Sequence, residues 1–401
     1  MIRKLIPWTL ATLLLGAWLC SVARAQSLPA GMRAPSTMRL PAGAANVGGT
    51  YAHFRTLTTD YTQAGSSDSS SFPVVVILNS SNAGTTMKTV ANGGHIQHTV
   101  TQVGGIGGME PADLVFSATS TCSTLLPWET ETYDATGGTL IAWVNIGTLS
   151  HTANNTFYLC YDGSGVTTQQ NTGSYAPSYV WNSHFMGVWH LPNGATLAVN
   201  DSTSNTTTFT TVTAVTATAG QVDGGGAFNG SAYLGHSVSS GGSLDLTDPL
   251  TIEAWVYPTT SGFNQVIVSN FNNSGFGNYT LELGATTGAI IWEHSGYTST
   301  LSVSPGWTVN AWNHIVIASS SGSQTVYING VVVGTAAQGA ASTGASILYV
   351  GGYVSSYLRN PLAGIIDEVR VSSASRSADW ITAEYNNQKT SSTFLTVGPE
   401  I

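Results

Sequence analysis

The stretch AWNHIVIASSSGSQTVYINGVVVG, residues 311–334, carries the strongest fold signal in the chain. Two β-branched runs follow each other there, HIVIASS (314–320) and TVYINGVVVG (325–334), and Asn329-Gly330 interrupts the second run. Asn and Gly both accept the positive φ that two-residue hairpin turns require. The stretch therefore predicts antiparallel strands joined by tight turns.

Similar short runs recur along most of the chain. They are rich in Val, Ile, Thr and aromatic residues, and clusters of Gly, Ser, Asn and Thr separate them: PVVVIL (73–78), TLIAWVNI (139–146), NTFYLCY (155–161), LTIEAWVYP (250–258) and YTLELG (279–284). Many short strands at this spacing are typical of β-sandwiches and barrels. Only SRSADWITAEYNN (375–387) has a clear helical pattern, with a serine N-cap. The sequence predicts an all-β chain with one short C-terminal helix.

The N-terminus has the features of a signal peptide. A basic pair at residues 3–4 precedes an apolar run over residues 5–19, and Ala23-Arg24-Ala25 has the small-x-small form of a cleavage site. We expect residues 1–25 to be removed near Ala25, and residues 26–50, rich in Pro, Gly and Ala, to form a flexible leader. No later apolar run approaches the roughly 20 residues that span a bilayer. These features predict a secreted or periplasmic protein without a membrane span in its mature chain.

Charge and cysteine content limit which classes of partner and which cellular compartment suit the protein. The chain has 11 Lys and Arg against 20 Asp and Glu, and three of the basic residues lie in the signal peptide. This balance argues against nucleic acid and anionic membranes as partners. Cys122 and Cys160 remain after cleavage, and export permits a disulfide between them. A bridge and two buried free thiols are both open at this point.

Two family resemblances cover nearly the whole mature chain. Residues 51–180 resemble an exported bacterial family called domain of unknown function 2341, through FPVVVIL, ADLVFSAT, LLPWETETYD, LIAWVNIGTLS, NTFYLCYDG and YVWNSHFMGVWHL, in that order. Residues 181–401 resemble the laminin-G-like jelly rolls of the concanavalin A-like lectin/glucanase superfamily, through DGGGAFNGSAYLG, LTIEAWVYP, the hairpin stretch, ILYVGG and GIIDEVRVSSASRSADWITAEYNNQ. The resemblance implies two β-sandwich domains, the second a jelly roll, that join near residue 180. It leaves function open, because a fold does not fix an activity.

The closing stretch IIDEVRV, residues 365–371, places a carboxylate on an apolar face. Strand alternation groups Asp367 with the valines, and it puts Glu368 and Arg370 on the other face, as a solvated or edge-strand pair. A buried carboxylate needs a hydrogen-bond donor, a cation or a metal. Jelly rolls of this superfamily often hold a structural Ca²⁺ through an acidic residue of the last strand. The resemblance therefore implies calcium at Asp367, with Asp201 and Asn205 among its oxygen ligands. Backbone N–H donors, or pairing with Arg376, are the alternative.

The stretch LPWETETYD (126–134) contains the only other candidate carboxylate pair. Glu129 and Glu131 stand two residues apart on a strand, about 7 Å, which falls in the ~6.5–9.5 Å range of inverting glycosidases. The pair lies outside the jelly roll, however, and the glucanase pattern of three alternating carboxylates is absent there. We expect a solvent-facing strand edge at this pair. Four histidines receive no catalytic role: His95 and His98, expected at the surface, and His184 and His190, near the domain junction.

Aromatic and amide side chains of the jelly-roll loops are the remaining resource for recognition. Sugar-binding surfaces combine exposed aromatic faces with side chains that hydrogen-bond hydroxyl groups. The candidates are Asn272, Asn273, Asn278, Tyr297, Trp307, Tyr353 and Tyr357. Burial in the core is the competing interpretation for each aromatic residue.

Three functions stay open on the sequence alone. The leading hypothesis is a non-catalytic exported protein that binds an extracellular glycan or cell-surface polymer through its jelly roll. The second is a glycoside hydrolase that uses Glu129 and Glu131. The third is a structural or adhesive component of a cell-surface assembly.

Overall fold

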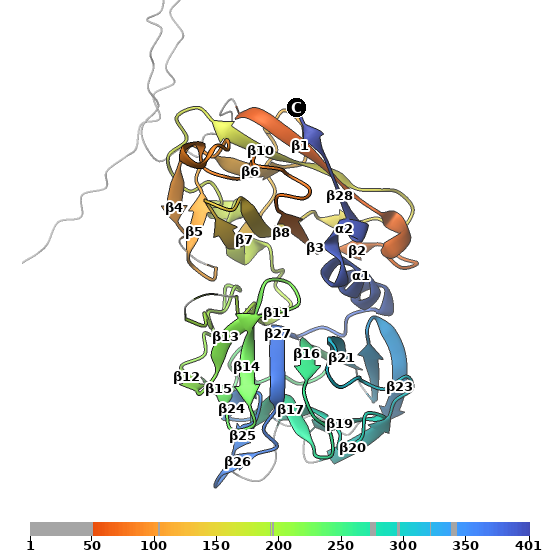
Figure 1. The fold of residues 1–401 in the computed structure, drawn as a ribbon. Helices are drawn as coiled ribbons and strands as arrows, with labels where there is room; N and C mark the ends of the chain where they lie inside the picture. The colour runs from red at the N-terminus through yellow and green to blue at the C-terminus, as the bar shows by residue number, and fades with distance from the viewer. Residues whose placement is uncertain are drawn as a thin grey trace, which may run out of the picture. The chain divides into compact units, whose positions relative to one another are not determined.

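The computed structural model describes residues 51–102, 105–192, 194, 196–272, 278–294, 297–320, 322–337 and 343–401. Strands dominate this part of the chain, and its two α-helices, α1 (Ala378–Lys389) and α2 (Ser391–Phe394), lie near the C-terminus (Figure 1). The all-β prediction is therefore confirmed. Neither helix is long and apolar enough to cross a membrane. The predicted signal peptide (1–25) and leader (26–50) lie outside the described residues.

The first set of sheets combines strands from the N-terminal part with the last strand of the chain. A four-stranded antiparallel sheet has the order β28-β1-β10-β6, and a three-stranded antiparallel sheet has the order β3-β8-β7. Two short pairs, β2–β9 and β4–β5, accompany them. The bounds are β1 (Tyr51–Thr59), β2 (Ser69–Ser70), β3 (Pro73–Leu78), β4 (Thr99–Thr101), β5 (Met109–Pro111), β6 (Leu114–Ser117), β7 (Trp128–Asp134), β8 (Thr139–Asn145), β9 (Thr148–Leu149), β10 (Thr156–Gly163) and β28 (Leu395–Glu400).

The jelly roll is formed by two large antiparallel sheets. One has the order β13-β14-β27-β16-β21-β22-β23, with β11 also paired to β27, and the other has the order β12-β15-β24-β17-β18-β19-β20. A separate hairpin, β25–β26, follows β24. The bounds are β11 (Phe185–Trp189), β12 (Thr211–Thr213), β13 (Thr216–Ala219), β14 (Gly224–Asn229), β15 (Tyr233–Val238), β16 (Leu250–Pro258), β17 (Gln265–Phe271), β18 (Tyr279–Leu283), β19 (Ala289–His294), β20 (Tyr297–Ser302), β21 (Asn313–Ser320), β22 (Ser323–Ile328), β23 (Val331–Ala337), β24 (Ser346–Val350), β25 (Tyr353–Val354), β26 (Leu358–Arg359) and β27 (Ala363–Ser372).

The Asn329-Gly330 turn connects β22 to β23 as predicted. Ile328 pairs with Val331, so the loop has two residues, and both loop residues have positive φ, 53° for Asn329 and 77° for Gly330. The Asn329 side chain also connects the turn to β21, because its Oδ1 accepts a hydrogen bond from the His314 backbone N–H. A short loop of this type fixes the register of the two strands.

The C-terminal helix joins the two sets of sheets. The Ser377 side chain caps α1 by accepting a hydrogen bond from the Trp380 N–H. Trp380 and Ile381 belong to the apolar core of the first set of sheets, and Trp255 of the jelly roll donates a hydrogen bond to Gln388 of the same helix. After α1, β28 pairs with β1. The domain boundary near residue 180 stays a prediction, and the chain returns to the first set of sheets after it.

A β-bulge in β27 reverses the predicted alternation of that strand. Trp255 pairs with Asp367 and Glu253 with Arg370, so the register shifts between them, and Glu368 has a φ of 52°. A bulge inserts one residue and turns the following side chains to the other face. Ile366, Val369 and Val371 therefore all join the jelly-roll core. The prediction that Asp367 shares a face with the valines is wrong.

Candidate functional site

Four ionisable side chains from three separate segments of the chain meet in the interior. Glu129 and Glu131 come from β7, His190 follows β11, and Glu368 lies in the β27 bulge. Their side chains are completely buried. The predictions of a solvent-facing edge at Glu129 and Glu131, and of a solvated face at Glu368 and Arg370, are therefore wrong. Alternation alone did not reveal which segment covers these faces.

His190 is the centre of this arrangement. Its Nδ1 lies 2.8 Å from Oε1 of Glu368 and 3.8 Å from Oε2 of Glu131. Its Nε2 lies 3.5 Å from Oε2 of Glu129. Each ring nitrogen therefore faces at least one carboxylate. The donor atoms of Glu131, His190 and Glu368 lie within 4.8 Å of one another, and we call these three residues the Glu131 group.

Indole and hydroxyl donors hold the carboxylates in place. Trp143 Nε1 donates to Oε2 of Glu131 at 2.7 Å, and Trp181 Nε1 donates to Oε2 of Glu129 at 2.8 Å. Ser202 Oγ donates to Oε1 of Glu129 at 2.6 Å. Both oxygens of Glu129 are thus satisfied, whereas Oε1 of Glu131 is buried without a hydrogen-bond partner.

Burial and mutual repulsion perturb the titration of this group. Burial raises the pKa of Glu131 well above 4.5, and the charge of Glu368 adds to the effect. Burial lowers the pKa of His190, but Glu368 and Glu129 outweigh it and raise that pKa well above 6.5. Burial also raises the pKa of Asp367, which is the next residue to Glu368. The surroundings therefore favour the protonated forms of Glu131, His190 and Asp367.

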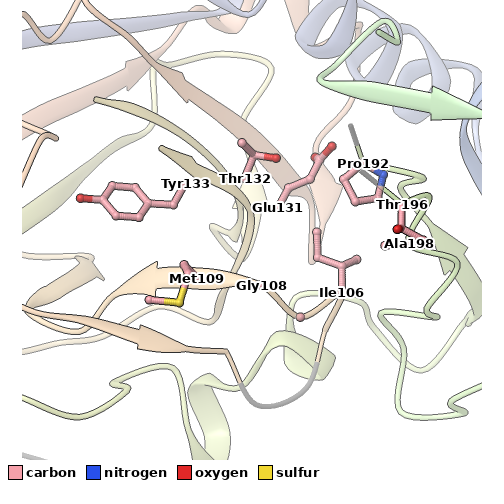
Figure 2. A pocket seen from close by; sticks show the side chains of 10 residues that line it. Ile106, Gly108, Met109, Glu131, Thr132, Tyr133, Pro192, Thr196 and Ala198 are labelled. Carbon is pink, nitrogen blue, oxygen red and sulfur yellow. The ribbon is translucent and has the colours of Figure 1, made fainter. Parts of the chain in front are cut away.

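Glu131 also lines a pocket of about 270 Å³. The other lining residues are Ile106, Gly107, Gly108, Met109, Thr132, Tyr133, Pro192, Thr196 and Ala198. Figure 2 shows the Glu131 side chain among them. Glu129 is absent from this lining, so the predicted carboxylate pair does not face one cleft within the described residues.

A second buried group has the same residue types. Glu253, His314 and Glu384, which we call the Glu253 group, bring three donor atoms within 4.8 Å of one another. Arg370 forms ion pairs with both glutamates and donates a hydrogen bond to Glu384. Arg370 outweighs burial and lowers the pKa of Glu384, and burial lowers the pKa of His314 to about 4. Arginine thus supplies the positive charge here.

Arg370 connects the two buried groups. Its Nη2 donates to Oε2 of Glu368 at 2.6 Å. Its guanidinium carbon lies 4.6 Å from the ring centroid of Trp143 and 5.1 Å from that of Trp181. Desolvated cation–π contacts of this kind stabilise a buried arginine. The sequence stretch YVWNSHFMGVWHL contains Trp181 and His190, and its density of aromatic residues and histidine was the available signal.

A third, half-exposed group lies on the four-stranded sheet. Nδ1 of His95 lies 3.4 Å from Glu400, and Nδ1 of His53 lies 3.8 Å from the same carboxylate. We call these three residues the His53 group. The side chains are 25–34% exposed, so His95 belongs to a cluster that the sequence did not predict. His98 is exposed, as expected.

The predicted calcium ligands have separate partners. Asp201 accepts backbone hydrogen bonds from Val188, Thr203 and Thr207. The Asn205 amide donates to the carbonyls of Phe185 and Met186. Asp367 Oδ2 accepts from the N–H groups of Gln221 and Val222, and its Oδ1 is buried without a partner. Backbone N–H groups thus satisfy Oδ2 of Asp367, as the alternative to calcium expects. Calcium binding at Asp367 stays a prediction.

The predicted glycan-binding residues divide between interior and surface. Trp307 and Asn278 are 2% and 0% exposed, which corrects their assignment, because a buried ring or amide is out of reach of an external sugar. Tyr353 is half-buried and Tyr357 is 62% exposed. Asn272 is half-buried. Two candidates receive no structural account: Asn273 and the side chain of Tyr297 lie outside the described residues.

Cys122 and Cys160 are joined by a disulfide, with the sulfur atoms 2.06 Å apart. The bond connects the loop after β6 to β10. Of the two alternatives left open by the sequence, the structure contains the bridge.

The comparisons with known proteins concern the jelly roll. Residues 228–382 match a family model described as the concanavalin A-like lectin/glucanases superfamily. This part of the chain is a concanavalin A-like jelly roll. The match starts later and ends earlier than the predicted 181–401 domain. No curated protein sequence matches the chain.

Solved structures show a similar but distant fold. Domain 4 of AbnA, a GH43 extracellular arabinanase from Geobacillus stearothermophilus in complex with arabinotriose, has 17% identity and a TM-score of 0.40, covering 50% of this chain and 97% of that one. A heptameric SAP-like pentraxin from Limulus polyphemus has 14% identity and a TM-score of 0.34, covering 39% and 78%. The CBM40 of Ruminococcus gnavus IT-sialidase bound to sialyllactose has 18% identity and a TM-score of 0.32, covering 38% and 96%. At these scores the likeness carries no functional information.

Proposed function

We propose that this protein binds a glycan, without catalysis, through the β25–β26 hairpin of its jelly roll. The observation that carries the proposal is the exposed ring of Tyr357, 62% accessible in the short loop between the two strands. Exposed aromatic rings stack on the apolar faces of sugars. Exposed apolar surface of this kind can mark a ligand-binding site. The superfamily of the matched domain, which includes lectins by description, agrees with this role.

Polar and aromatic neighbours complete the surface. The Arg359 guanidinium carbon lies 4.7 Å from the Tyr357 ring centroid, and Arg359 donates a hydrogen bond to the Tyr357 hydroxyl. Phe271 and Tyr353 form a ring pair with centroids 4.5 Å apart, and Asn272 follows Phe271 in the chain. Arg359 and Asn272 supply donors for sugar hydroxyls beside these rings. Figure 1 shows β25 and β26 at the end of the jelly roll.

Residues outside the matched region extend the proposal to the whole chain. Residues 51–180 resemble the exported bacterial family named above, and residues 1–25 have signal-peptide features. We place the protein outside the cytoplasm of a bacterium, after cleavage near Ala25, where glycans and cell-surface polymers are accessible. Mass spectrometry of the secreted N-terminus tests the cleavage site, and a mature chain that still carries residues 1–25 contradicts it.

A glycan array with the full mature chain tests the binding function. We expect the wild type to bind at least one glycan class, and Tyr357→Ala to weaken that binding about tenfold, which corresponds to about 1.4 kcal/mol. Tyr179→Ala is the matched control, because Tyr179 is 56% exposed elsewhere on the protein and its loss should leave binding unchanged. Equal binding by wild type and Tyr357→Ala contradicts the assigned surface.

The glycoside hydrolase alternative has a direct test in the same preparation. Both Glu129 oxygens accept hydrogen bonds from Trp181 and Ser202, so the geometry favours a structural role for this carboxylate. Polysaccharide turnover that is present in the wild type and abolished in Glu129→Gln would replace the binding function with a catalytic one.

A further inference from the structure

We propose that the Glu131 group, Glu131, His190 and Glu368, binds a divalent transition-metal cation of the zinc class. This inference goes beyond the glycan-binding function and does not depend on it. The three side chains come from β7, the residue after β11 and β27. A cation here would join strands of both sets of sheets through one coordination centre.

The donor set and its spacing suit zinc. Nδ1 of His190 lies 2.8 Å from Oε1 of Glu368 and 3.8 Å from Oε2 of Glu131. Ligand atoms at Zn–N and Zn–O distances of about 2.0–2.2 Å stand roughly 3.3 Å apart in a tetrahedral site. Small side-chain shifts therefore bring the atoms to zinc geometry. An imidazole nitrogen with two carboxylates suits zinc better than calcium, which prefers six to eight oxygens.

The outer contacts are those of an oriented metal site. Metal-binding histidines commonly donate their second N–H to a carboxylate, and ligating carboxylates are themselves hydrogen-bonded. Here Nε2 of His190 faces Oε2 of Glu129 at 3.5 Å, while Nδ1 faces the proposed cation. Trp143 donates to Glu131, and Arg370 donates to Glu368. Glu131 and Glu368 thus each have a donor that fixes their orientation, whereas Nε2 of His190 makes no hydrogen bond.

Buried oxygens without a partner are the independent observation that points to a cation. The Glu131 side chain is completely buried, and its Oε1 has no hydrogen-bond partner. Asp367 and Asp223 act electrostatically on the same carboxyl group, and Oδ1 of Asp367 is also buried and unpartnered. Among the described residues, Glu131 forms no ion pair with Lys or Arg. A bound cation would satisfy these oxygens.

A pocket of about 270 Å³ lies beside the Glu131 group. Figure 2 shows Glu131 in its lining with Thr132 and Pro192. The Glu131 side chain is nevertheless completely buried, so the carboxylate itself is not open to the pocket in this structure.

Two other groups of possible donors serve as internal controls. In the Glu253 group, Arg370 already pairs with both glutamates, so we expect no ion there. The His53 group is half-exposed and has two histidines, so it is the competing zinc site. The experiment must separate the Glu131 group from the His53 group.

Zinc binding to the full mature chain tests the proposal, by metal analysis after gel filtration and by calorimetric titration. We expect the His95→Ala variant, which disables the His53 group, to retain one zinc per chain. Adding Glu131→Gln to the His95→Ala variant should weaken zinc binding at least tenfold. Adding Glu129→Gln to the His95→Ala variant should weaken zinc binding about 10–100-fold. Combining it with Glu253→Gln, the matched control, should leave it unchanged.

Two outcomes would each overturn the proposal: loss of all zinc binding in His95→Ala, or unchanged zinc affinity after Glu131→Gln is added to it. Full-chain circular dichroism confirms that the glutamine variants fold.

Discussion

The Glu131 group and the Glu253 group contain the same residue types, one histidine between two glutamates, yet their surroundings differ. Arg370 pairs with both glutamates of the Glu253 group, whereas in the Glu131 group it reaches only Glu368. Residue Glu131 also lines a pocket, although its side chain is completely buried. Both groups contain buried oxygens without a hydrogen-bond partner, Oε1 of Glu131 in one and Oε2 of Glu253 and of Glu384 in the other. What distinguishes the two groups is therefore the guanidinium, which already supplies a cation to both glutamates of the Glu253 group.

The difference also shows in the two histidines. Carboxylates raise the pKa of His190, despite the opposing effect of burial. In the Glu253 group, burial lowers the pKa of His314 to about 4, and Arg370 contributes to the lowering. At His314 the opposing effect of Glu384 does not outweigh burial, whereas at His190 the carboxylates do, so the balance between burial and nearby charges decides the charge of each histidine.

The largest expected effect follows from removing the shared arginine. Arg370→Met leaves Glu368, Glu253 and Glu384 buried without their cation. Loss of one partner of a buried ion pair costs about 3–5 kcal/mol, so we expect the free energy of unfolding to fall by about that amount. Urea denaturation measures it. Arg359→Met, at the exposed hairpin, is the matched control and should leave stability unchanged; a similar stability for both variants contradicts the network.

A smaller loss is expected from Glu384→Gln in the Glu253 group. The substitution keeps the shape of the side chain but removes the charge that faces Arg370. A hydrogen bond to a charged group contributes about 1.5–3 kcal/mol, so we expect destabilisation of about 2 kcal/mol at pH 7 in denaturant titrations. Glu253 still pairs with Arg370 in this variant, which limits the loss. An unchanged stability means that the ion pair is dispensable.

The same substitution at Glu131 should raise, not lower, the free energy of unfolding of the metal-free protein. Burial and Glu368 raise the folded-state pKa of Glu131 above its ordinary 4.5. The folded protein then holds a proton that the unfolded chain releases, so stability falls as pH rises from about 4.5 toward the folded pKa. Glu131→Gln removes this loss, and we expect a gain of about 1 kcal/mol at pH 8, with a weaker pH slope. Destabilisation that is equal at pH 5 and pH 8 contradicts this account.

The protonation states of the two histidines can be measured in the unsubstituted protein, so this test perturbs the structure least. We expect ¹⁵N NMR of metal-free protein at pH 7 to show His190 doubly protonated and His314 neutral. On acidification, His314 should gain its proton only near pH 4, so its burial contributes stability above pH 6.5 that is lost as pH falls toward 4. A neutral His190 at pH 7 would mean that Glu129 and Glu368 do not hold a proton between them.

Calcium tests the choice of ion. The sequence-based prediction expects calcium to raise the melting temperature of the wild type and not that of Asp367→Asn. The structure leaves only one unpartnered oxygen on Asp367, so we expect a shift of at most about 2 °C, smaller than that of zinc. Equal calcium responses in wild type and Asp367→Asn would remove calcium from this position.

Local patterns were sufficient for much of the fold. The Asn329-Gly330 hairpin depends on two adjacent residues and formed as predicted. The C-terminal helix likewise has its cap, Ser377, and its apolar residues within one segment. Such features are readable because their partners lie close by in the sequence.

The candidate site was less predictable because its contacts are distant in sequence. Glu131 and His190 are 59 residues apart in number, and Glu368 follows His190 by 178. The Glu368 bulge also reversed the assumed alternation, which moved Asp367 away from the core valines. A strand pattern cannot show which segment covers an acidic face, so Glu129 and Glu131 were assigned to solvent.

Anomalous diffraction at the zinc absorption edge, from crystals of the full mature chain grown with zinc, tests the central comparison most directly. We predict a peak between Glu131, His190 and Glu368, and none between Glu253, His314 and Glu384. A peak in the Glu253 group, or none in the Glu131 group when zinc is bound elsewhere, would contradict the conclusion that Arg370 decides which cluster holds a cation.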